Sequence, residues 1–71
     1  MNQIKKVFAG TKVYNDVVAL LETGKATFDM IDLNSGLYVK LTTMLKENKI
    51  NYTESQNLYS EYCRNFKLGG Y

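Results

Sequence analysis

The segment TESQNLYSEYCRNFK, residues 53–67, combines the signals for the start, the buried face and the end of a helix. Thr53 and Gln56 have the spacing of a capping box, in which each side chain bonds the other's backbone N–H. One helical face is apolar: Leu58, Tyr59, Tyr62, Cys63 and Phe66. Gly69-Gly70 follows as a stop. We therefore predict a helix over 54–67.

Two upstream stretches show the same helical period. In residues 12–23 (KVYNDVVALLET) the larger apolar side chains fall within about 160° of arc. Thr11 can cap this stretch and Gly24 can end it in a left-handed conformation. Residues 37–48 (LYVKLTTMLKEN) follow Ser35 as a second cap. Their apolar stripe consists of Leu37, Tyr38, Leu41, Met44 and Leu45. Both patterns predict helices.

The secondary structure of the intervening segment, ATFDMIDLNSG at residues 26–36, is ambiguous. Apolar and polar residues alternate in it, which favours a short strand at 26–32 over a helix. A hairpin of 26–33 with 37–41 is an alternative, because Asn-Ser-Gly suits a three-residue turn. We favour a helix at 37–48 over this hairpin, since the apolar stripe continues beyond residue 41. Residues 2–8 suit either a short helix or a strand.

With 71 residues the chain is long enough for one small domain, which we place at residues 1–68 with a flexible tail at 69–71. Cys63 is the only cysteine and histidine is absent, so neither a disulfide nor a zinc site can stabilise the thin core. We predict a mostly α fold, with helices near 12–23, 37–48 and 54–67. Its core is predicted to contain Leu41, Leu45, Leu58 and Tyr62.

We expect neither a secretion signal nor a membrane-spanning stretch, because the longest apolar run is Val17 to Leu21. A lone thiol suits a reducing compartment, so we expect a cytoplasmic location. The chain starts at a methionine and carries no tag, so we expect a complete small protein. Lysine supplies eight of the nine basic residues, and asparagine and tyrosine are frequent, which suggests an AT-rich phage or plasmid genome.

Catalytic residues are scarce. Without histidine, and without a GxxxxGKS/T phosphate loop, we expect neither an enzyme nor a bound cofactor. Asp29 and Asp32 are the only close carboxylate pair outside a predicted helix, and ordinary solvated side chains explain them better than a cation site. Cys63 lies on the apolar face of the last predicted helix, where it should be buried and unreactive.

Tyrosine is the most distinctive component, with six of the nine aromatic residues and no tryptophan beside it. Its ring offers rigid apolar area and its hydroxyl a polar group, so it is favoured at protein interfaces. Beside lysine it can also stack on nucleotide bases while the lysine contacts phosphate. The candidate partner-binding residues are Tyr38, Tyr52, Tyr71, Lys40, Lys46 and Lys49.

Two functional classes follow from these features. We favour a protein-binding module, such as an adaptor, inhibitor or regulatory subunit, because three apolar helical faces occur without any run of charge. The alternative is a dimeric nucleic-acid-binding regulator, since strand, helix and helix is the element order of a ribbon–helix–helix dimer. Its outward strand residues would be Lys25, Thr27 and Asp29, and the aspartate and the mild net charge of +2 count against it. Self-association would give the small core extra support.

Overall fold

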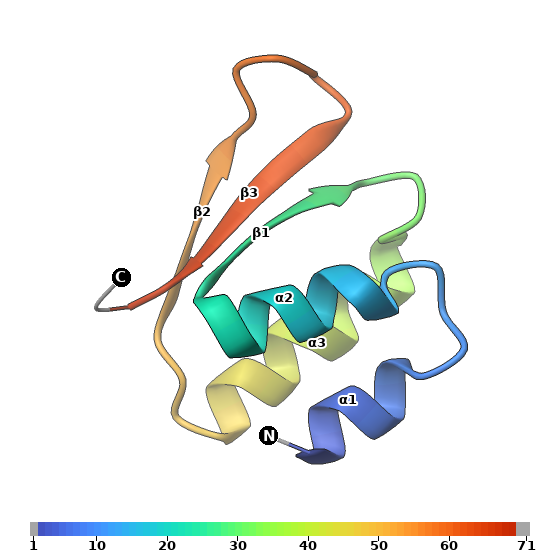
Figure 1. The fold of residues 1–71 in the computed structure, drawn as a ribbon, viewed down its shortest axis with the longest axis vertical. Helices are drawn as coiled ribbons and strands as arrows, with labels where there is room; N and C mark the ends of the chain where they lie inside the picture. Colours follow the sequence, from blue (N-terminus) through green and yellow to red (C-terminus); the bar gives the residue numbers. More distant parts are fainter. Residues whose placement is uncertain (1, 70–71) are drawn as a thin grey trace.

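The computed structural model describes residues 2–69, and Figure 1 shows its helices packed to one side of a small sheet. The elements in chain order are α1 (Asn2–Phe8), α2 (Tyr14–Thr23), β1 (Lys25–Asp29), α3 (Ser35–Glu47), β2 (Tyr52–Gln56) and β3 (Cys63–Leu68). The fold is therefore α/β with a three-stranded antiparallel sheet, and the predicted mostly helical fold is wrong.

The last strand, β3, occupies the centre of the sheet. The strand order is β1-β3-β2, and both neighbours run antiparallel to β3. Lys25 lies opposite Lys67 at one end of the β1–β3 pair, and Asp29 lies opposite Cys63 at the other. Because β1 and β2 flank the same strand, α3 connects two strands that run in the same direction. Figure 1 shows the loop between β2 and β3 extending beyond the layer of helices.

Two of the three predicted helices are present, with different caps. The helix predicted at 12–23 runs from Tyr14 to Thr23 and ends at Gly24, whose φ of 82° is left-handed as expected. Thr11 does not cap it, because its hydroxyl donates to the carbonyl of Phe8 at 2.7 Å. The helix predicted at 37–48 is α3. The side chain of Asn34, and not Ser35, accepts from its first turn.

The predicted strand at 26–32 is present as β1, at Lys25–Asp29, and its outward residues are those expected. Lys25, Thr27 and Asp29 are exposed, whereas Phe28 is fully buried against the helices. Residues 2–8 form helix α1. No helix within residues 2–69 has the length and apolar character needed to cross a bilayer.

The predicted helix at 54–67 is wrong, and this segment forms the β2–β3 hairpin instead. Asn57 and Ser60 explain the difference, because their side chains bond the local backbone and so compete with a helix. Asn57 Oδ1 accepts from the N–H of Tyr59 at 2.8 Å and from that of Ser60 at 3.1 Å. The segment therefore turns at residues 57–60, and its two halves pair as strands.

The core lies between the inner face of the sheet and the three helices. Its fully or nearly fully buried apolar residues are Ile4, Phe8, Val13, Val17, Leu20, Leu21, Phe28, Leu33, Leu41, Leu45, Phe66 and Leu68. The predicted core positions Leu41 and Leu45 are confirmed, since both are fully buried. Leu58 and Tyr62 were also predicted for the core, and that prediction is wrong because both are exposed at the end of the hairpin.

Candidate functional site

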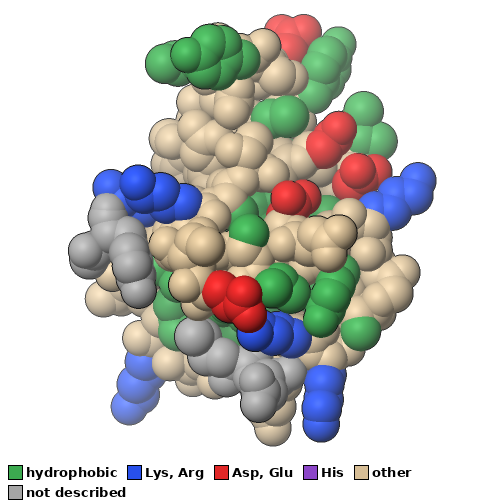
Figure 2. Space-filling view, viewed as in Figure 1, with side chains coloured by type: hydrophobic (Ala, Val, Ile, Leu, Met, Phe, Trp, Pro, Cys, Tyr) green, Lys and Arg blue, Asp and Glu red, His purple; other side chains and the backbone are tan. Residues whose placement is uncertain are grey.

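The end of the β2–β3 hairpin carries the most exposed large apolar side chains of the described residues. Leu58 is 93% exposed, Tyr59 96% and Tyr62 61%. Ile31 in the turn after β1 is 73% exposed. The N–H of Met30 donates to the carbonyl of Tyr62 at 2.8 Å, which places Ile31 beside the end of the hairpin. These four residues, Ile31, Leu58, Tyr59 and Tyr62, are called the apolar tip, and Figure 2 shows apolar side chains gathered at this end of the molecule.

The backbone beneath the apolar tip is held by hydrogen bonds. Besides the two bonds to Asn57 Oδ1, the Ser60 Oγ accepts from the N–H of Tyr62 at 3.2 Å. The N–H of Cys63 donates to the Ser60 carbonyl at 3.3 Å, and Asn57 Nδ2 donates to Asn65 Oδ1 at 3.0 Å. The loop is thus ordered before any partner arrives, which lowers the entropic cost of binding through it.

Three carboxylates neighbour the apolar tip. Asp32 and Glu61 each follow or precede a tip residue in the chain, and Asp29 Oδ1 accepts from the N–H of Ile31; these three residues are called the acidic rim. The two salt bridges within residues 2–69 join Lys5 to Glu22 and Arg64 to Glu54, so no rim carboxylate has a basic partner there. Burial raises the pKa of Asp16 on α2, and the negative charge of the rim residue Asp32 adds to this shift.

A polar network lies where the hairpin meets α3. The Tyr38 hydroxyl donates to Glu54 Oε2 at 2.6 Å, and the Arg64 Nε donates to Glu54 Oε1 at 3.3 Å. Both oxygens of the half-buried Glu54 are therefore occupied, and the network ties β2 and β3 to the helix. The hydrogen bond to Glu54 is the main cause, and burial the second cause, that raises the pKa of Tyr38 to about 12.

The raised pKa of Tyr38 makes a pH-dependent contribution to the stability of the fold, and a Tyr38→Phe variant should remove this contribution. Because the folded-state pKa lies above the ordinary 10.0, the protonated phenol stabilises the fold fully below pH 10.0, and this contribution is lost as the pH rises through about 12. Subtracting the variant's near-ultraviolet absorbance titration from that of the wild type should leave a single transition with its midpoint at about 12. A midpoint at 10.0 would contradict the bond to Glu54.

Four of the six predicted partner-binding residues lie on or near the edge formed by α3 and β2. Lys46, Lys49 and Tyr52 line a hollow of about 470 Å³. Tyr38 does not line this hollow, but its hydroxyl donates to Glu54, which does. Lys40 is exposed on α3 and does not line this hollow. Tyr71, like the predicted tail beyond Gly69, lies outside the described residues.

Structural roles account for all four residues, and that of Tyr38 is its bond to Glu54. The Tyr52 ring stacks on Phe66 with centroids 5.9 Å apart, so it is largely a packing residue. Lys49 has a left-handed φ of 58°, and its N–H donates to the carbonyl of Lys46 at 3.0 Å. Such a turn ends a helix, and lysines in this position complement the negative end of the helix dipole.

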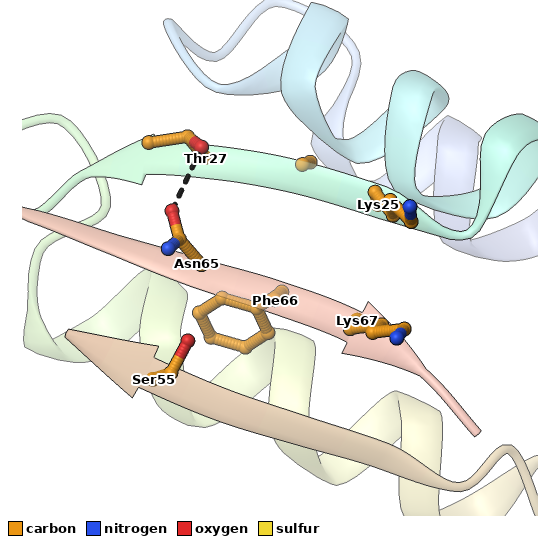
Figure 3. Close-up of a pocket in the computed structure, with 7 residues that line it drawn as sticks. Lys25, Thr27, Ser55, Asn65, Phe66 and Lys67 are labelled. Carbon is orange, nitrogen blue, oxygen red and sulfur yellow. Dashed lines mark hydrogen bonds between the residues drawn. The ribbon is translucent and has the colours of Figure 1, made fainter. Parts of the chain in front are cut away.

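The outer face of the sheet is polar and forms a hollow of about 510 Å³. Figure 3 shows Lys25 on β1 and Lys67 on β3 at one end of it, with Thr27 and Ser55 further along. The Thr27 hydroxyl donates to Asn65 Oδ1 at 2.9 Å. Lys25 and Lys67 are direct cross-strand neighbours, and like charges in that arrangement destabilise a sheet slightly. This face can attract an anion.

The remaining candidates for chemistry are not brought together. Cys63 is half-buried on β3 opposite Asp29, and not on the apolar face of a helix as predicted. Asp29 Oδ1 accepts from the N–H of Ile31 at 2.8 Å, so this carboxylate stabilises the turn after β1. Within the described part of the chain, no three cysteine or acidic side chains cluster where a metal ion could bind.

Sequence reasoning missed Ile31, Arg64 and the loop at residues 57–62. The loop does carry a local signal, because Asn57 and Ser60 are residues that bond the backbone two or three positions on. Arg64 could have been singled out as the one arginine among eight lysines. No family model, no curated protein and no solved structure matches the chain. The site is therefore defined by its own geometry.

Proposed function

We propose that this chain is a small non-catalytic protein-binding module that inserts its apolar tip into an apolar hollow of another protein. The observation that carries the proposal is the combination of an ordered loop with large apolar side chains that are 61% to 96% exposed. Burying each such side chain is worth about 1.5–3 kcal/mol. Tyrosine and aliphatic anchors on a rigid support are typical of interface hot spots.

The acidic rim adds a preference in partner. Asp29, Asp32 and Glu61 would oppose one another across a symmetric self-contact through the tip. A partner hollow edged by lysine or arginine would instead meet opposite charge, which favours encounter and orientation. This charge pattern supports a different protein, acting as the target of an adaptor, inhibitor or regulatory subunit, over a second copy of the chain.

Nucleic-acid binding is the second candidate, supported by Lys25 and Lys67 on the outer face of the sheet. The proposed ribbon–helix–helix arrangement does not support it, because β1 pairs with β3 of its own chain and the second helix is absent. Two opposed lysines give few phosphate contacts, and such binding weakens steeply as salt rises.

The test is a capture experiment with three forms of the protein: wild type, a tip variant and a matched surface variant. The tip variant combines Leu58→Ser, Tyr59→Ser and Tyr62→Ser, and the control is Val39→Ser, which changes an apolar side chain that is 60% exposed on α3. The capture is carried out after nuclease treatment and at high salt. The expected targets are proteins that the wild type and the control retain and the tip variant does not.

An identified target is then purified and its affinity measured calorimetrically. The tip variant should bind at least about 30-fold more weakly, because losing central anchors costs about 2 kcal/mol or more. The control should bind like the wild type. Equal binding by the tip variant would overturn the proposal. Retention that disappears with nuclease and with Lys25→Glu and Lys67→Glu would establish the nucleic-acid alternative instead.

A further inference from the structure

A second hollow, separate from the apolar tip, opens between the hairpin and the start of α3. Its volume is about 400 Å³, within the range of pockets that hold small ligands. Met30, Leu33 and Tyr38 supply largely apolar walls, and Ser35 and Arg64 are the polar residues that line it. This combination of apolar walls with few polar groups is typical of a site for a small, partly apolar ligand.

Arg64 is placed to hold two acceptors at once. Its Nε donates to Glu54 Oε1, and no hydrogen bond from its terminal Nη groups occurs within residues 2–69. A guanidinium is planar and carries five N–H donors, so one edge can bind Glu54 while the Nη groups bind a second anion. Lysine, which this chain otherwise uses for every basic position, is a single point charge and cannot bridge in this way.

The neighbouring groups favour a singly charged ligand. Glu54 is held by both Arg64 and Tyr38, so the guanidinium already faces one carboxylate. A phosphate dianion would bring two more negative charges next to Glu54, and Ser35 is the one lining side chain besides Arg64 and Tyr38 that could donate to its other oxygens. A carboxylate brings one charge and two oxygens that match the guanidinium edge.

We propose that this hollow binds a carboxylate attached to an apolar group, with the carboxylate on the Nη groups of Arg64 and the apolar group against Met30, Leu33 and Tyr38. The same chemistry is offered by the C-terminal residue of a peptide that ends in an apolar side chain and by a free arylalkanoic acid. The inference does not depend on the apolar tip, because none of the four tip residues lines the hollow.

The test is a titration of the full chain followed by nuclear magnetic resonance. The probes are 3-phenylpropionate, its uncharged amide 3-phenylpropionamide, and inorganic phosphate. A dissociation constant on the order of 1 mM is expected for the acid, given ordinary ligand efficiencies. Saturable shifts should appear at the Arg64 Nε–H and the Met30 methyl group. The amide and phosphate should each bind at least about tenfold more weakly, because the carboxylate is the recognised group.

Two peptide probes distinguish the sources of the carboxylate. Gly-Gly-Phe with a free C-terminus should bind more tightly than 3-phenylpropionate if the site takes peptide ends, and its C-terminal amide should lose that binding. Tighter binding of 3-phenylpropionate than of the peptide would instead identify a small-molecule site. Either result supports the shared carboxylate chemistry.

The variants separate recognition from folding. Arg64→Gln should weaken 3-phenylpropionate at least about tenfold, and Arg64→Lys should also weaken it because one point charge cannot bind both carboxylates. Lys67→Gln, which removes a positive charge on the outer face of the sheet, is the matched control and should bind like the wild type. The inference is overturned if the amide binds wild type as well as the acid does, or if the shifts cluster at lysines. The amide comparison holds even if Arg64→Gln does not fold.

Discussion

Leu41→Ala is expected to lower the free energy of unfolding by about 2–5 kcal/mol, whereas Leu58→Ala should change it by no more than about 0.5 kcal/mol. Both substitutions remove the same atoms. Leu41 is fully buried in the core on α3, and Leu58 is 93% exposed at the end of the hairpin. Only the first substitution leaves a cavity and loses buried apolar area.

The loss at Leu41 is comparable to the whole stability of so small a domain, which amounts to about 0.05–0.15 kcal/mol per residue. Leu41→Ala should therefore be largely unfolded or melt far below the wild type. Denaturant unfolding followed by circular dichroism measures both variants under the same conditions. Equal losses at the two positions would indicate that Leu58 is buried, as a third helix at 54–67 would require.

Phe66→Ala is expected to be at least as damaging, at about 3–5 kcal/mol. Phe66 is 1% exposed on the central strand and meets three other aromatic rings. The ring of Phe28 lies 5.0 Å away edge-on, that of Tyr38 lies 6.3 Å away edge-on, and that of Tyr52 is stacked at 5.9 Å. Each such pair adds about 0.5–1.5 kcal/mol beyond area burial.

The matched control for Phe66→Ala is Tyr59→Ala, which removes an aromatic ring of similar size from the same hairpin. Tyr59 is 96% exposed and should cost little. Hydrogen exchange gives a second readout, since loss of the Phe66 ring should expose the amides of β2 and β1 together. Loss of protection in β2 alone would show that Phe66 does not join the two edge strands through the core.

Stability and the proposed binding surface are thus carried by different side chains. Residues that hold the fold, such as Leu41 and Phe66, are buried beneath the sheet, and the β2–β3 loop, which carries most of the apolar tip, lies beyond the layer of helices (Figure 1). A variant of the tip can therefore lose a partner while keeping its unfolding curve. This separation is what allows the capture experiment to distinguish loss of binding from loss of structure.

The sequence by itself determined the elements whose pattern is local. Residues 12–23 and 37–48 each bury one helical face along their own length, so their periodicity predicted α2 and α3 and the burial of Leu41 and Leu45. The alternation at 26–32 predicted β1 and its outward residues for the same reason. Such patterns report which side of an element faces the core.

Apart from the local turn signal of Asn57 and Ser60, the tertiary structure decided residues 53–67 and the candidate site. Leu58, Tyr59, Tyr62 and Phe66 have helical spacing, but the hairpin is stabilised by pairing with β1, whose Thr27 bonds Asn65 across 38 residues of sequence. That stabilisation comes from a distant segment, so it is invisible in a local window. The apolar tip and the Arg64 hollow exist only because β3 runs down the middle of the sheet, which brings residues 30–38 against residues 62–64.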